Sequence, residues 1–137
     1  VHELLRRALL STTLQRSYLA VVEGVLEKKA GLIDLPIARE EGSIIKRCVS
    51  SHGDAARTHY EVVSAGKNCT LVRLFPETGR THQLRVHAAH TEGLGTPIVG
   101  DEIYGKKAKR LMLHAETLGF THPTTNEYIK IVCQAEF

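Results

Sequence analysis

The chain has 137 residues, of which 42% are apolar, and a formal charge of +3 at pH 7. No apolar stretch approaches the ~20 residues of a membrane-spanning helix, and there is no low-complexity tract or repeat of fixed period. These absences exclude membrane-spanning, fibrous and repeat architectures, so the sequence predicts one soluble domain, residues 1–137, with a modest core. The basic balance favours a polyanionic partner without establishing one, because many ordinary domains carry a similar charge.

The cysteines indicate a compartment. Cys48, Cys69 and Cys133 stand far apart, and an odd number without CxxC spacing argues against both a disulfide framework and a zinc site. An intracellular, reducing setting is therefore expected, either the cytoplasm or an organelle matrix of a eukaryote. The chain begins at Val1 and its only methionine is Met112, which is typical of an excerpt or a processed piece of a longer product.

The start of the chain predicts a helix and then a strand. The apolar residues of ELLRRALLST, residues 3–12, recur at helical spacing, so a short helix is expected to end before Gln15. SYLAVVEGV, residues 17–25, alternates with period two, which places Tyr18 and Ala20 on one face of a strand.

The middle of the chain predicts further strands. LIDLPI, residues 32–37, is apolar and is closed by Pro36. THYEVVS (58–64) and CTLVRLF (69–75) are rich in β-branched and aromatic residues and are expected to pair. The Ala-Gly-Lys-Asn between them is expected to supply the positive φ of a hairpin turn.

The last part of the chain predicts one helix and two strands. Thr81 is a candidate N-cap for a helix that runs through His90. LMLHAETLGF (111–120) and YIKIVCQ (128–134) are expected to be strands, separated by the turn-prone segment 122–127. The combined pattern predicts an α+β fold with a mainly antiparallel sheet.

The stretch FPETGRTHQLRVHAAH, residues 75–90, concentrates basic side chains at the predicted helix start. Arg80 lies beside the free backbone donors of the first turn, and Arg85 lies about one turn farther on. The guanidinium of Arg85 has the geometry to hold a carboxylate or a phosphate by two parallel hydrogen bonds. A solvated basic helix face explains the same spacing equally well.

A second motif, GDEIYGKK at residues 100–107, matches most of a phosphate-binding GxxxxGK[ST] loop. Lys107 replaces the hydroxyl that would bind magnesium, and Asp101 and Glu102 would repel phosphate inside the loop. A turn with a solvated basic end is the better interpretation.

The histidines of the predicted helix are candidate metal ligands. His82, His87 and His90 have near-helical spacing, but no carboxylate or cysteine completes a ligand set. Hydrogen-bonded surface or core histidines are therefore expected, and no metal.

Three motifs in order carry a resemblance to a known family. TGRTHQLRVH (78–87), GTPIVGDEIYG (95–105) and LMLHAETLGFTHP (111–123) closely resemble the C-terminal half of the catalytic domain of RluA-type RNA pseudouridine synthases. SYLAVVEG, GLIDLPI and ARTHYEVV fit the earlier part of the same pattern. The resemblance extends from about Gln15 to Phe137.

The resemblance implies an enzyme that isomerises uridine to pseudouridine in ribosomal or transfer RNA, with neither cofactor nor metal and no membrane. It also implies a mixed, mainly antiparallel sheet with flanking helices around a central cleft, into which the target nucleotide is flipped. The 137 residues would form the C-terminal portion of that catalytic domain.

The resemblance also assigns roles to individual residues. Arg85 would pair with the catalytic aspartate and keep it ionised, Tyr18 would stack on the base and assist its proton, and Leu113 would pack against both. Contacts to RNA phosphates or to the motif's own loop are implied for Arg80, Thr81, His82 and Gln83.

The nucleophile is the main departure from the family pattern. The family carries it in a histidine-arginine-leucine-aspartate (HRLD) run before the SYLAVV strand, and this sequence has no such run. Asp34, Asp54 and Asp101 match other places of the pattern, so this chain alone is predicted to be inactive. The segment AAHTEGLGTP (88–97) is also a few residues longer than the usual link.

Three interpretations follow. The first is a truncated or excerpted synthase, and the second is a noncatalytic RNA-binding remnant of the same fold. The third, a generic α+β binding module with a structural Arg85, is disfavoured because the three motifs occur in order.

Overall fold

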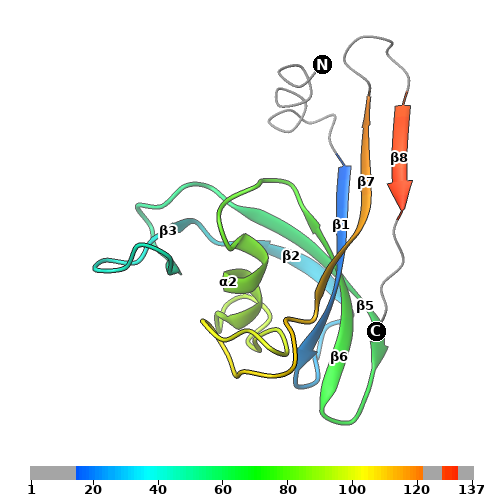
Figure 1. Cartoon of the computed structure of the whole chain (residues 1–137), viewed down its shortest axis with the longest axis horizontal. Coiled ribbons are helices and arrows are strands. Elements are labelled where there is room, and N and C mark those ends of the chain that lie inside the picture. The colour runs from blue at the N-terminus through cyan, green and yellow to red at the C-terminus, as the bar shows by residue number, and fades with distance from the viewer. Residues whose placement is uncertain (1–14, 122–127, 133–137) are drawn as a thin grey trace.

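The computed structural model describes residues 15–121 and 128–132 and shows an α+β fold (Figure 1). Six strands form one sheet in the order β2-β5-β6-β1-β7-β8, every neighbouring pair is antiparallel, and β3 and β4 form a separate hairpin. The elements are β1 (Gln15–Glu23), β2 (Ala30–Asp34), β3 (Ile37–Arg39), β4 (Arg47–Val49), β5 (Arg57–Ala65), β6 (Cys69–Pro76), α2 (Gln83–Ala89), β7 (Leu113–Thr121) and β8 (Tyr128–Val132). The predicted fold class is confirmed.

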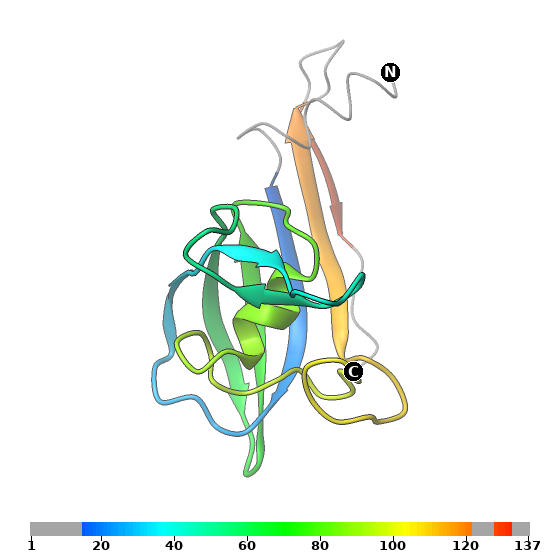
Figure 2. The same cartoon turned by 90° about the vertical axis from the view of Figure 1, so that its left-hand side faces the viewer.

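The core lies between the sheet and α2, which packs against one face of it (Figure 2). The alternation in β1 sends Ala20 and Val22 to that face, where both are completely buried. Val72 of β6 and Leu84 of α2 join them in the same apolar cluster. The residues of β1 that share a face with Ala20 in the period-two pattern therefore lie on the side of the sheet that α2 covers.

The predicted pairing of β5 with β6 is confirmed, but its turn differs from the prediction. The backbone N–H of Gly66 donates to the carbonyl of Cys69 at 2.9 Å, and none of the four turn residues has positive φ. A register shift between Val62 and Ser64 interrupts the ladder just before the turn. Because a bulge adds twist to the hairpin, ordinary backbone angles can close it.

The predicted helix start was wrong by one residue. The N-cap of α2 is His82 rather than Thr81, and it makes no side-chain capping bond. His82 has φ 56° and ψ 18°, and it is the only described non-glycine residue with positive φ. Because the chain turns sharply at His82, Thr81 lies outside the helix and is exposed.

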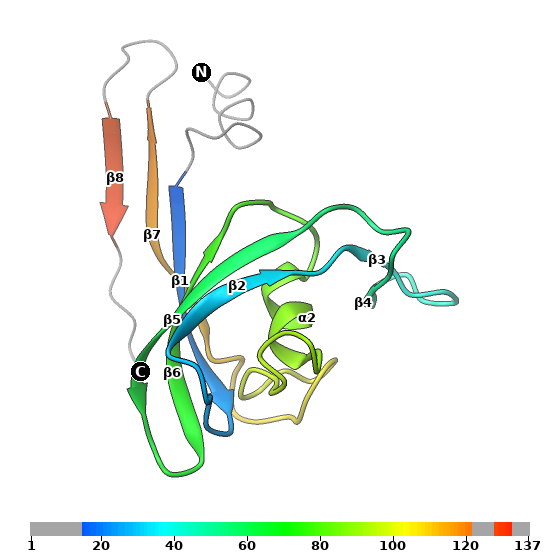
Figure 3. The ribbon, with the colours of Figure 1, turned by 180° about the vertical axis from the view of Figure 1, so that it is seen from behind.

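The β3–β4 hairpin projects from the sheet beside α2 (Figure 3). The predicted strand LIDLPI is divided, because β2 ends at Asp34 and β3 begins at Ile37, after Pro36. Ile37 packs with Val86 of α2 in a second buried cluster, which fixes the hairpin against the helix.

The remaining predictions concern three strands, the first helix, a turn and the cysteines. The strands expected in 17–25, 111–120 and 128–134 correspond to β1, β7 and β8. The helix expected in 3–12, the turn at 122–127 and Cys133 lie outside the described residues. Cys48 and Cys69 are free thiols. In the described part of the chain, no helix is long and apolar enough to cross a membrane.

Candidate active site

A cavity of about 290 Å³ opens where the start of α2 faces β1 and β7. It gathers residues that are far apart in the chain, and every predicted site residue except Thr81 lines it, namely Tyr18, Arg80, His82, Gln83, Arg85 and Leu113. The fold therefore brings the motif 78–87 onto the same cavity as the SYLAVV strand and the LMLHA segment.

The lining of this cavity is strongly basic. Arg16, Arg80 and Arg85 contribute guanidinium groups, and no aspartate or glutamate of the described chain lines it. Arg85 is paired with the buried Asp101, whereas Arg16 and Arg80 have no ion-pair partner among the described residues, so the cavity attracts anions such as phosphates or carboxylates. The geometry therefore suits a negatively charged ligand.

Tyr18 and Leu113 supply the apolar part of the cavity from neighbouring strands. Tyr18 of β1 is opposite Ala115 of β7, and Ala20 is opposite Leu113, so Tyr18 and Leu113 are diagonal neighbours on one face. Both side chains are half-buried. The hydroxyl of Tyr18 has no hydrogen-bond partner among the described residues, so the ring and the aliphatic side chain together suit a planar base with polar edges.

Arg85 forms a two-point ion pair with Asp101. Its Nη2 donates to Oδ1 at 2.6 Å and its Nε donates to Oδ2 at 3.0 Å. Asp101 is fully buried, and its Oδ1 also accepts the backbone N–H groups of Ile103 and Tyr104. Within the described chain, two of the Arg85 donors hold Asp101, a partner that the sequence analysis did not name, and the pairing of Arg85 with a catalytic aspartate stays a prediction.

The charges of this pair are mutually stabilised. Burial raises the pKa of Asp101, but hydrogen bonds from Arg85 and from the backbone N–H of Tyr104 outweigh it and hold the pKa below its usual range. The hydrogen bond with Asp101 raises the pKa of Arg85. The Nη1 group of Arg85 has no hydrogen-bond partner in the described chain, so it remains available at the cavity.

His82 is held by Tyr104. The hydroxyl of Tyr104 accepts the backbone N–H of Arg47 at 2.9 Å and lies 2.7 Å from Nδ1 of His82. Burial lowers the pKa of His82, and the positive charges of Arg85 and Arg47 lower it further. The neutral imidazole can then accept the Tyr104 proton on Nδ1, which leaves an Nε2–H donor on a residue that lines the cavity.

Gln83 organises the motif loop. It is 3% exposed, and its Oε1 accepts the Thr78 hydroxyl and the backbone N–H of Arg80. Its Nε2 donates to the carbonyl of Arg57 and to the hydroxyl of Thr58. Of the two contacts predicted for Gln83, the structure shows those to the motif's own loop, because its amide is occupied inside the protein.

Arg80 is positioned differently from Gln83. Its side chain is exposed, and its Nε donates to the carbonyl of Ala55 at 2.9 Å. This single bond anchors the guanidinium and leaves its two terminal nitrogens without partners among the described residues.

Arg16 is a cavity residue that the sequence analysis missed. Its Nη2 donates to the carbonyl of Thr78 at 2.8 Å, whereas its buried Nε has no partner among the described residues. Gly79 lies against it, since a Cβ at Gly79 would be 3.2 Å from Nη1. The signal was available in the sequence, because Arg16 precedes Tyr18 by two residues and shares its strand face.

The metal prediction can be compared with the geometry. Within the described residues, no group of three His, Cys, Asp or Glu side chains could hold a metal ion. His87 is 1% exposed, with Nδ1 2.9 Å from the Thr58 hydroxyl and Nε2 2.9 Å from the Leu35 carbonyl. The expectation of a hydrogen-bonded core histidine is confirmed for His87.

Comparisons with known proteins agree on one family. A family model described as RNA pseudouridylate synthase matches residues 1–90. The uncharacterized RNA pseudouridine synthase YjbO of Bacillus subtilis is 42% identical over 132 residues, which cover 94% of this chain and 46% of that protein. Ribosomal large subunit pseudouridine synthase D of Nitrosomonas europaea is 38% identical over 137 residues, which cover 91% of this chain and 39% of that protein.

Solved structures give the same result. The structure of human RNA Pseudouridylate Synthase Domain Containing 1 matches with a TM-score of 0.82 and 31% identity, covering 96% of this chain and 59% of that chain. Human RNA Pseudouridylate Synthase Domain Containing 4 matches with a TM-score of 0.70 and 28% identity. The chain spans about half the length, or less, of the curated relatives described above.

Proposed function

Because the chain belongs to the RNA pseudouridylate synthase family, we propose that it is the C-terminal portion of a catalytic domain that isomerises uridine to pseudouridine in RNA. The observation that carries this proposal is the cavity, which combines three arginines, no carboxylate from the described chain, and the half-buried Tyr18 and Leu113. A nucleotide presents the matching chemistry, a planar base attached to an anionic backbone.

The proposed roles follow from the geometry. Tyr18 and Leu113 hold the flipped base, and the free hydroxyl of Tyr18 assists a proton of the base. Arg85 presents its remaining Nη1 donors to the carboxylate of the nucleophilic aspartate and keeps it ionised. Asp101 is then a positioning residue, because it fixes the plane of the Arg85 guanidinium from behind.

RNA contacts are proposed for the exposed or cavity-lining part of the motif. Arg80 has two unpaired terminal nitrogens, Thr81 is exposed, and His82 offers a neutral N–H donor. Gln83 supports these residues by fixing the loop that carries them. We expect the reaction to need neither cofactor nor metal.

The nucleophile is proposed to come from outside these 137 residues, because the sequence contains no histidine-arginine-leucine-aspartate run. Ribosomal RNA is the favoured substrate, since relatives named for the ribosomal large subunit align over most of the chain, and transfer RNA is the alternative. A reducing, intracellular compartment is proposed from the cysteine pattern.

A noncatalytic RNA-binding remnant of the same fold is the second candidate, and its support is the basic cavity alone. Such a protein would keep the basic cavity and bind RNA without turning it over. The two candidates make different predictions once a nucleophile is supplied.

The test is to incubate the chain with transcribed ribosomal RNA and to detect pseudouridine by carbodiimide labelling and primer extension. The bare chain should form none, because no residue of the cavity replaces the aspartate. Fusion to an upstream segment that contains HRLD should restore activity. Turnover by the bare chain would contradict the nucleophile assignment, and RNA binding without turnover by the fusion would favour the remnant.

A further inference from the structure

A second cavity, of about 370 Å³, adjoins the first one, and Gly79 and Arg80 line both. Its far wall is the β3–β4 hairpin, which contributes Arg39 and Arg47, and its near wall includes Thr81. Because the two cavities share the segment between Thr78 and Thr81, a single extended strand could pass from one to the other.

The second cavity is also basic. Arg39, Arg47 and Arg80 converge on it from two different parts of the chain, against one carboxylate, that of Asp54. Within the described residues, Asp54 makes no ion pair with any of the three arginines. Three guanidinium groups against one carboxylate leave this cavity with an excess of positive charge.

Two of the three arginines, Arg47 and Arg80, are anchored in ways that leave donors free. Arg47 donates from Nη1 to the carbonyl of Ile45 at 2.9 Å, and Arg80 donates from Nε to the carbonyl of Ala55 at 2.9 Å. The terminal Nη2 of Arg47, both terminal nitrogens of Arg80 and the whole guanidinium of Arg39 have no partner in the described chain. An anchored guanidinium with unpaired terminal donors is well suited to a phosphate.

The hairpin that carries two of these arginines is fixed in place. Ile37 packs in a buried cluster with Val86 of α2, and the backbone of Ile37 pairs with that of Asp54 through two hydrogen bonds of 2.9 Å. The backbone N–H of Arg47 donates to the Tyr104 hydroxyl, which in turn contacts His82 of the first cavity. The second cavity is therefore preorganised relative to the first.

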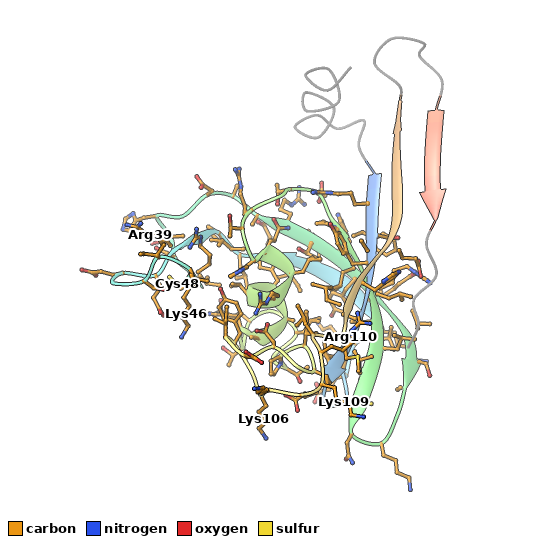
Figure 4. The ribbon with its side chains drawn as sticks, viewed as in Figure 1. Arg39, Lys46, Cys48, Lys106, Lys109 and Arg110 are labelled. Carbon is orange, nitrogen blue, oxygen red and sulfur yellow. The ribbon has the colours of Figure 1, made fainter. Side chains whose placement is uncertain are left out.

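Figure 4 shows where the exposed basic side chains lie around these elements. Arg39 and Lys46 lie on the β3–β4 hairpin, and Lys106, Lys109 and Arg110 lie on the segment that leads into β7. Arg39 lines the second cavity together with Arg80, whereas none of the three basic residues near β7 lines it.

We propose that the second cavity binds the RNA backbone next to the target nucleotide, with Arg39, Arg47 and Arg80 contacting its phosphates. This inference rests on the proposed function, since it needs a nucleotide in the first cavity. The RNA strand then passes along the shared wall and continues over the β3–β4 hairpin. These contacts add affinity and register without reading sequence, because phosphates are common to every nucleotide.

The test measures binding of the 137-residue chain to a fluorescein-labelled oligouridylate of about ten nucleotides, a length within single-strand site sizes. Anisotropy titrations over a series of salt concentrations give the slope of log K against log salt. Arg39→Ala should weaken binding and reduce the magnitude of this slope by about 0.7, the value for one lost single-strand phosphate contact. Arg39→Lys should retain the slope, because it keeps the charge.

Lys67→Ala is the matched control. Lys67 is exposed in the turn between β5 and β6, which Figure 1 shows at the bottom of the molecule, away from the β3–β4 hairpin. This variant removes the same charge and should leave the slope unchanged. Because Arg39 is exposed, both variants should show the thermal unfolding of the parent chain.

The outcomes separate this inference from the proposed function. Binding by the parent chain with equal slopes for Arg39→Ala and Lys67→Ala would overturn the phosphate assignment and leave the proposed function standing. A parent chain that does not bind the oligouridylate, or binds it without salt dependence, would overturn both. A slope reduced only in Arg39→Ala supports the inference.

Discussion

At the scale of single residues, the ion pair of Arg85 and Asp101 explains how a cation is held at the mouth of the cavity. Asp101 is fully buried, and the side chain of Arg85 is 19% exposed. A buried carboxylate is costly without partners, and here a guanidinium and two backbone N–H groups supply them. The arrangement fixes the plane of Arg85 while leaving Nη1 free.

Asp101→Asn tests this arrangement through stability. The amide keeps the volume but removes the charge, so Arg85 loses its counterion. The free energy of unfolding should fall by about 3 kcal/mol, the lower end for a broken buried pair, because the Arg85 side chain is partly exposed. Urea denaturation measures the change. Glu77→Gln, in an exposed ion pair with Arg57, is the matched control and should cost less than about 1 kcal/mol. Equal effects of the two substitutions would show that the buried pair has no special role.

Tyr18→Phe tests the role of the free hydroxyl. The ring is kept, so RNA affinity should change little, whereas turnover should fall by about a hundredfold if the hydroxyl assists proton transfer. The measurement compares RNA binding and pseudouridine formation in the chain fused to an HRLD-containing segment. Tyr60→Phe, on β5 outside the cavity, should alter neither property. A Tyr18→Phe fusion with parental turnover would remove Tyr18 from the chemistry.

At the scale of elements, α2 is tied to the sheet by a line of buried polar side chains. Gln83 donates to the Thr58 hydroxyl, which is 2.9 Å from Nδ1 of His87, and Nε2 of His87 lies 2.9 Å from the Leu35 carbonyl. Since the Thr58 hydroxyl accepts from Gln83, it can donate to His87, which requires the neutral imidazole with its proton on Nε2.

This arrangement predicts a stability that falls in acid. Burial lowers the pKa of His87 in the folded chain, so the unfolded chain binds the proton more readily. Neutral His87 makes its full contribution to the free energy of unfolding above about pH 6.5, the pKa of histidine in the unfolded chain. This contribution is lost as the pH falls through the lower pKa of His87 in the folded chain. His82, whose pKa is also lowered, acts in the same direction.

Urea midpoints between about pH 7.5 and pH 5.5 measure the effect. The parent midpoint should drop across this range, and His87→Gln should be less stable at the higher pH but show a flatter profile. His52→Gln, at an exposed position, should keep the parental profile. An unchanged pH profile in His87→Gln would contradict the assignment.

At the scale of the whole molecule, the sheet has β2 and β8 as its outer strands in the described part of the chain. All but one of the five residues of β2 are exposed, and Leu32 is 42% exposed. An outer strand with unpaired backbone groups and an exposed apolar side chain invites pairing with another chain. We therefore predict that the 137-residue chain self-associates through this edge.

Sedimentation velocity at increasing concentration tests the edge. Leu32→Lys should shift the chain toward the monomer, because a charge on an outer strand opposes pairing. Ile44→Lys is the matched control, since Ile44 is 85% exposed but lies between β3 and β4, outside the six-stranded sheet. A parent chain that stays monomeric would refute the prediction, and equal effects of both variants would attribute association to general hydrophobicity.

Local patterns determined much of this protein. The period-two alternation of β1 predicted which of its residues share a face, and the two β-rich runs predicted the β5–β6 hairpin. The resemblance carried by the motif 78–87 and the SYLAVV strand named most of the residues that line the cavity. These features depend on neighbours within a few residues, which the sequence displays directly. The position of Arg16 could also be read from its neighbours in the sequence, because it lies two residues before Tyr18 on the same strand face, but the sequence analysis did not name it.

Only the tertiary structure decided which distant groups meet. The left-handed backbone of His82 displaced the predicted helix start from Thr81, and Asp101, separated from Arg85 by 16 positions, became its partner. The buried amide of Gln83 and the alignment of the two basic cavities likewise depend on how α2 and the β3–β4 hairpin pack on the sheet. Such contacts are chosen by long-range packing and by the need to satisfy buried charges, and neither is encoded in the spacing of residues along the chain.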